Sequence, residues 1–166
     1  MALNFPEGTQ DLPARVIQCV QGTKSDKATT TSTSWVDLNL NASITPKLSS
    51  SRILVHVQLG SFCNRLASKR AFASLVRGSS HILHGTNSTG AECSIALCTR
   101  SNNDNYIQVP VSMHYLDQPN TTSSTTYTVY YKCGADGGTA TVNSSYSQDS
   151  NTGNATSTII LMEVAT

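Results

Sequence analysis

Residues 106–115 read Tyr-Ile-Gln-Val-Pro-Val-Ser-Met-His-Tyr and alternate between apolar and polar side chains. Successive side chains of a β-strand point to opposite faces, so the apolar members of the run share one face. Pro110 has no amide hydrogen to donate to a neighbouring strand, which predicts a sheet edge or a bulge at that point. The inward-facing residues of this predicted strand are Ile107, Val109, Val111, Met113 and Tyr115.

The same alternation recurs along the chain. In Arg52–Leu59 the apolar residues Ile53, Val55, Val57 and Leu59 point one way, and His56 and Gln58 point the other. The final run, 157–164, is apolar on both faces, which indicates a strand in the middle of a sheet or covered by a partner. Other predicted strands are 16–21, 35–40, 71–76, 81–84, 94–99, 127–133 and 139–143.

Nine or ten short strands without an amphipathic helix predict an all-β fold, a jelly-roll-like antiparallel β-sandwich. Residues 16–166 are expected to form this single domain. Residues 1–15 contain two prolines and scattered apolar side chains without periodicity, so we expect an extended N-terminal arm.

The composition excludes several classes of protein. The chain has 166 residues, of which 13% are charged and 44 are Ser or Thr, and its net charge is +1. This weak charge argues against nucleic-acid binding, and the lack of an apolar run of about 18 residues argues against a membrane span. The first residues resemble no secretory signal. The five cysteines are therefore expected to be reduced and mostly buried, with a Cys93–Cys98 disulfide as the alternative.

No pattern in the sequence predicts a catalytic, cofactor or metal site. His81 and His84 are three apart, so in a strand their imidazoles point to opposite faces and do not converge on a metal. We expect them to be surface or hydrogen-bonded histidines. Residues 85–90 resemble the start of a phosphate-binding loop but lack its lysine. The expectation is a protein that is not an enzyme.

Positive charge is concentrated in residues 38–100, which carry seven basic residues against Glu92 alone. The sequence suggests one basic surface that docks on an acidic partner, and the alternative is that these side chains scatter around the sandwich. The candidates for the docking surface are Arg52, Arg65, Lys69, Arg70 and Arg77.

Several sequence segments resemble those of a group of bacteriophage virion proteins that is common in phages of aquatic bacteria, including cyanophages. They are residues 45–55, 74–79, 115–119, 125–127 and 157–164, and the resemblance covers about residues 16–166. It implies a trimeric jelly roll of the tumour-necrosis-factor/C1q type, used either as a capsid decoration (cement) protein or as a fibre module.

Two functions follow as expectations. In the first, a homotrimer binds the lattice of the major capsid protein and stabilises the phage head, so that the protein is part of the virion surface after assembly in the host cytoplasm. In the second, the chain is a receptor-binding or adhesive tail or head fibre module that recognises a host-surface glycan. Neither function involves nucleic acid or a membrane.

Two sets of residues are candidates for these contacts. Tyr127, Val129 and Tyr131 alternate on one strand face and are predicted to lie in the trimer interface. Leu3, Phe5 and Leu12 are isolated apolar residues of the arm and are predicted to attach it to the capsid. The alternative for the arm is that it packs on its own trimer or covers a sheet edge.

Overall fold

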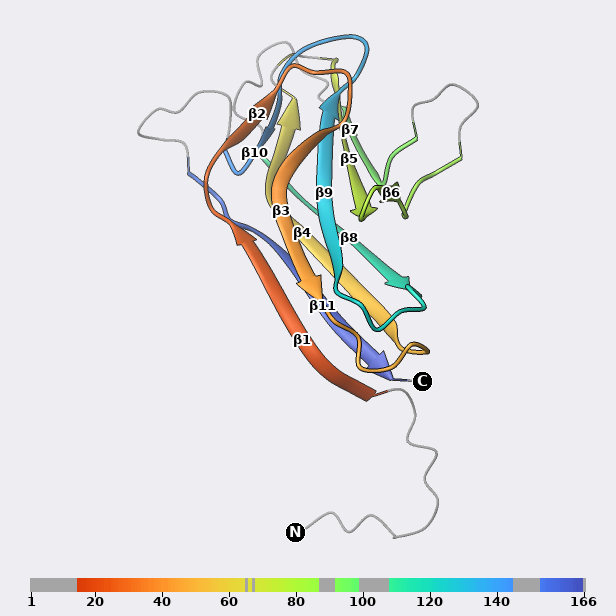
Figure 1. Cartoon of the computed structure of the whole chain (residues 1–166). Helices are drawn as coiled ribbons and strands as arrows, with labels where there is room; N and C mark the ends of the chain where they lie inside the picture. Colours follow the sequence, from red (N-terminus) through yellow and green to blue (C-terminus); the bar gives the residue numbers. More distant parts are fainter. Residues whose placement is uncertain are drawn as a thin grey trace, which may run out of the picture.

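The computed structural model describes residues 15–64, 66, 68–86, 92–98, 108–144 and 153–165. Every regular element in this part of the chain is a strand, so the predicted all-β class is confirmed (Figure 1). No helix in it could cross a membrane. The strands are β1 (Arg15–Lys24), β2 (Ala28–Thr30), β3 (Val36–Ile44), β4 (Arg52–Asn64), β5 (Arg70–Arg77), β6 (Ser80–His81), β7 (Ile95–Cys98), β8 (Val109–Asp117), β9 (Thr125–Cys133), β10 (Ala140–Val142) and β11 (Ser157–Ala165).

The strands form two antiparallel sheets that pack face to face. Sheet A has the order β1–β11–β4, with β8 on the other side of β4, and β10 and β2 continue it beyond the end of β11. In sheet B, β3 pairs with β9 and β9 with β5, and β6 and β7 both pair with β5. The chain crosses between the sheets from β3 to β4, from β4 to β5 and from β8 to β9. This alternation gives the jelly-roll-like sandwich that the sequence predicts.

The core lies between the two sheets and follows the predicted alternation. Ile53, Val55, Val57 and Leu59 of β4 are all 0% exposed, whereas the residues between them are partly exposed. β11 is central in sheet A, between β1 and β4, as its apolar sequence indicates. The fully buried residues that sheet B contributes to this core include Leu38 and Leu40 of β3 and Leu75 of β5.

β8 confirms the edge position predicted from Pro110. Among the described residues it pairs with β4 alone, and the register between them shifts between Leu59 and Phe62, opposite Pro110. Pro110 therefore lies where β8 and β4 are out of register, so its missing amide hydrogen costs no hydrogen bond between the two strands.

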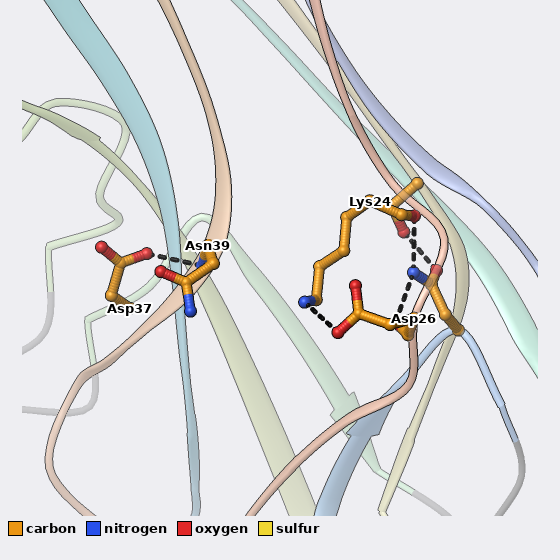
Figure 2. A network of polar contacts seen from close by, with 6 residues as sticks. Lys24, Asp26, Asp37 and Asn39 are labelled. Atoms are coloured by element: carbon orange, nitrogen blue, oxygen red, sulfur yellow. Dashed lines mark hydrogen bonds and ion pairs between the residues drawn. The ribbon is translucent and has the colours of Figure 1, made fainter.

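One lateral edge of the sandwich is closed where β1 passes over β3. A Cβ atom on Gly22 would lie 2.0 Å from the backbone oxygen of Asn41, so a larger residue cannot occupy this crossing. Figure 2 shows the polar contacts beside the crossing, where Nζ of Lys24 meets Oδ2 of Asp26 at 2.8 Å. On β3, a carboxylate oxygen of Asp37 accepts a hydrogen bond from the amide of Asn39, which has a positive φ of 57° and marks a bulge.

Two predicted boundaries need correction. Arg15 pairs with Ala165, so β1 begins at the last residue of the predicted arm. The predicted strand 81–84 is replaced by the two-residue β6 at 80–81: the bond from the amide of Ile82 to the carbonyl of Leu75 at 3.0 Å still follows the β5–β6 alignment, and the chain then bends at Leu83.

Candidate functional site

The residues predicted to form a trimer interface lie in the core instead. Tyr127, Val129 and Tyr131 are 0%, 0% and 3% exposed and point between the sheets from β9, which is flanked by β3 and β5. The prediction was wrong because alternation identifies a face that must be covered but not whether the second sheet or another molecule covers it. Any contact between copies must use other residues.

The proposed basic residues do not form one surface. Lys69 and Arg70 lie at the start of β5 and Arg77 at its end, and a strand of eight residues separates its ends by roughly 23 Å. Arg77 is also engaged internally, because Asp117 accepts two hydrogen bonds from its Nη1. Arg52 is exposed at the start of β4. Arg65, like the predicted attachment residues Leu3, Phe5 and Leu12, lies outside the described residues.

The outer face of sheet A carries a cluster of apolar side chains, which we call the sheet A face. The inward residues Ile159 and Leu161 of β11 are fully buried, so the residues between and after them point outward and are partly exposed. Strand register places outward residues of β1, β4 and β8 beside them. The members of the sheet A face are Val16, Leu54, His56, His114, Leu116, Ile160, Met162 and Val164.

The sheet A face is nearly free of charge. Val16 and Leu116 at its margins are 56% and 45% exposed; its members carry no formal charge, and the exposed Arg52 and Arg15 lie at its border, opposite Val164 and next to Val16. His56 on β4 lies directly opposite His114 on β8. Their rings are stacked, with centroids 6.1 Å apart and an angle of 4° between the ring planes. A face of this kind suits contact with an apolar surface.

The outer face of sheet B holds a second cluster, which we call the tryptophan–histidine cluster. The hydroxyl of Ser74 on β5 contacts Nδ1 of His81 at 2.7 Å and Nε2 of His84 at 2.5 Å. The two imidazole centroids are 4.4 Å apart, and the ring of Trp35 lies 5.2 Å from that of His81. Nζ of Lys132 stands 4.5 Å from the centre of the Trp35 ring.

The histidine pair corrects the sequence prediction that these rings do not converge. The prediction assumed that 81–84 is a strand, but β6 ends at His81 and the turn that follows brings His84 back over Ser74. The expected hydrogen bonding is confirmed. The described residues contain no group of three or more His, Cys, Asp and Glu side chains that could hold a metal ion. Each ring directs one nitrogen to Ser74, so the remaining nitrogens point away from that shared oxygen.

Ser74 is not suited to nucleophilic catalysis despite its two histidine partners. Its side chain is 0% exposed, because β9 and the chain after β6 cover it. A nucleophile must reach the substrate, and this hydroxyl reaches only the imidazoles.

An open cleft of about 460 Å³ lies where β5 and β8 end. Its lining includes Arg77, Pro119 and hydroxyl side chains of the loop after β8 and of the start of β9, such as Thr121, Ser124 and Thr126. Because Asp117 is 5% exposed and pairs with Arg77, the cleft has little net charge. Its size falls within the usual range for small-molecule sites.

The cysteines are less buried than predicted. Cys63 and Cys133 are buried, Cys93 is partly exposed, and Cys19 and Cys98 are exposed. Burial raises the pKa of the Cys63 and Cys133 thiols, which makes them unreactive. Cys93 carries a free thiol, so it is not bonded to Cys98. The extended β7 separates the two residues by more than a disulfide can span.

Sequence reasoning found the sheet A face in part and missed the tryptophan–histidine cluster. The apolar outer residues of β11 were the signal for the first. The second depends on contacts among β5, β9 and the segments around Trp35 and His84, which no local pattern reveals. In the comparisons with known proteins, no family model matches the chain, and no curated protein is significantly similar to it.

Proposed function

We propose that this chain is a structural virion protein, a capsid decoration (cement) protein that binds and stabilises a phage head as a homotrimer. The proposal rests on the resemblance of residues 16–166 to phage virion proteins and on the jelly-roll-like sandwich, which suits that role. The observation that supports self-association is the sheet A face, an apolar surface on an otherwise hydroxyl-rich chain.

A second copy of the chain is the occupant that fits the sheet A face. In a trimer, like residues of the three copies come together where a surface faces the threefold axis, so such a surface must avoid concentrated charge of one sign. The sheet A face meets this condition, since none of its members carries a formal charge. The number of three copies comes from the resemblance to jelly rolls of the tumour-necrosis-factor/C1q type.

Attachment to the major capsid protein is assigned to the N-terminal arm. Three arms on one trimer would bind the lattice together, so that weak individual contacts give firm attachment through avidity. The capsid-binding residues in this proposal are Leu3, Phe5 and Leu12. The protein would then act on the virion surface without catalysis.

Immunogold electron microscopy of virions from the phage that encodes the chain tests this function. An antibody raised against the purified protein should label the head densely, and quantitative mass spectrometry should give hundreds of copies per particle. A protein that is absent from purified virions is not a decoration protein. Pre-immune serum and labelling of the major capsid protein provide the controls.

The cleft beside Arg77 favours a second function, recognition of a host-surface glycan by a fibre module. Its hydroxyl lining and compensated charge would suit a neutral, hydroxyl-rich ligand better than an anion. Labelling confined to the tail or to a few fibres, together with glycan-array binding that Thr126→Val abolishes, would support this alternative over decoration. Ser112→Val, on the exposed face of β8 away from the cleft, is the matched control.

A further inference from the structure

The tryptophan–histidine cluster ties the chain that follows β6 to the outer face of sheet B. Both imidazoles bond to Ser74, one from the end of β6 and the other from three residues later. The segment is also fixed by the bond from the amide of Ile82 to the carbonyl of Leu75 and by Ser94, whose hydroxyl bonds to the carbonyl of Leu83. Residues 82–86 are thus held by the two imidazole contacts to the buried hydroxyl, by the contacts of Ile82 and Ser94, and by the bond from the amide of Gly85 to the carbonyl of Cys93.

The shared hydroxyl makes these contacts sensitive to protonation. A serine hydroxyl has one hydrogen to donate and two lone pairs, and a neutral imidazole has one donor and one acceptor nitrogen. While at least one ring is neutral, Ser74 can donate to that ring and accept from the other. When both rings are protonated, neither of the nitrogens that face Ser74 can accept a hydrogen bond. The buried hydroxyl hydrogen of Ser74 then has no imidazole acceptor.

Charge acts in the same direction. Two imidazolium rings with centroids 4.4 Å apart repel each other, and Lys132 adds a third positive charge over the neighbouring Trp35 ring. Glu92, before β7, is the acidic group that attracts His84; Tyr130 meets the His81 ring edge-on, and burial raises the pKa of the Cys93 thiol. Double protonation thus places more positive charge in the cluster than Glu92 can compensate.

The proton affinities agree with this geometry. Burial lowers the pKa of His81, and the neighbouring His84 and Lys132 lower it further. Burial also lowers the pKa of His84, with Glu92 opposing and Lys132 reinforcing the effect. The folded arrangement therefore disfavours protonation and is lost as the pH falls.

We propose that Ser74, His81 and His84 form an acid-sensitive latch, which holds residues 82–86 on sheet B at neutral pH and releases them when both imidazoles are protonated. Release would uncover the half-buried side chains Ile82 and Leu83, which pack against the core. The chain would then expose a new apolar surface in acid, independently of the sheet A face and of the virion role.

Trp35 reports on this latch because it is the single tryptophan of the chain and contacts both imidazoles. Its fluorescence should show a transition below about pH 6.5, the ordinary histidine value, while far-UV circular dichroism stays constant. His81→Gln/His84→Gln should abolish the transition. His56→Gln/His114→Gln, which changes the stacked pair on sheet A, should retain it.

Hydrogen exchange measured on the wild-type protein tests release itself. After correction for the intrinsic effect of pH, the amides of Ile82 and Gly85 should exchange at least tenfold faster at pH 5 than at pH 7.5. The amide of Val57, in the core of β4, should keep its protection. A fluorescence transition that survives in His81→Gln/His84→Gln, or unchanged protection of Ile82 and Gly85 at pH 5, would overturn the proposal.

Discussion

Nη1 of Arg77 on β5 donates to both carboxylate oxygens of Asp117 on β8, at 2.8 and 2.7 Å. Because β5 belongs to sheet B and β8 to sheet A, this ion pair joins the two sheets at one end of the sandwich. The hydroxyl of Tyr127 donates to the same carboxylate at 2.7 Å. Burial and this bond to Asp117 both raise the pKa of Tyr127, so it remains a donor at any ordinary pH.

Replacing Asp117 with Asn should weaken the join between the sheets. Asp117→Asn leaves the partly buried Arg77 without its counter-charge and should lower the free energy of unfolding by about 3 kcal/mol. Tyr127→Phe removes one of the three hydrogen bonds and should cost only about 1 kcal/mol. Urea unfolding at pH 7 measures both. Equal stability of Asp117→Asn and the wild type would show that the pair contributes nothing.

Glu163 should give the protein part of its sensitivity to acid. Its side chain is 0% exposed, and burial by itself raises its pKa. Hydrogen bonds from the side chain of Gln18 and from the amides of Lys47 and Leu48 outweigh burial, so that the net pKa is lowered. The unfolded chain therefore takes up this proton first as the pH falls.

The stabilisation by Glu163 is present above about pH 4.3, the ordinary glutamate value, and is lost as the pH falls through the lower folded-state pKa. Glu163→Gln should be less stable than the wild type by about 1–3 kcal/mol at pH 7, and the difference should shrink toward pH 3. A Glu163→Gln difference that is constant with pH would contradict this assignment.

The cysteines should contribute by packing, without a disulfide. Thermal unfolding midpoints with and without dithiothreitol should agree within about two degrees, and thiol titration of the native protein should modify the exposed Cys98 well before Cys63 and Cys133. A drop of about ten degrees in reductant would reveal a structural disulfide and contradict this assignment, and mass spectrometry would then identify the bonded pair.

The arm should be dispensable for folding but needed for attachment. Because β1 begins at Arg15, a chain without residues 2–14 keeps every described strand and should have an unchanged unfolding midpoint. If the arm is the anchor, this truncated chain no longer binds particles that lack the protein. Binding equal to that of the full chain would place attachment elsewhere, with exposed basic residues such as Arg52 and Arg70 as the next candidates.

The sequence was most informative where a strand alternates between two environments. The inward residues of β4 could be predicted because the alternation of apolar and polar side chains is a local property of the sequence. The edge position of Pro110 could be predicted because proline itself lacks the amide hydrogen that a paired strand donates. The partner that covers a face is not local, so Tyr127, Val129 and Tyr131 were assigned to an interface although the opposite sheet buries them. The convergence of His81 and His84 depends on a turn after β6, which strand periodicity cannot reveal.

Self-association through the sheet A face is the physical basis of the proposed function, and sedimentation velocity at micromolar concentration tests it most directly. The wild type should sediment with three times the 17.7 kDa mass of one chain, and Leu116→Glu on the sheet A face should sediment as a single chain. Leu66→Glu is the matched control, because Leu66 is also 45% exposed but lies beyond the end of β4, and it should behave as the wild type. A wild-type protein that sediments as one chain, or a Leu116→Glu variant that keeps the threefold mass, would contradict association through this face.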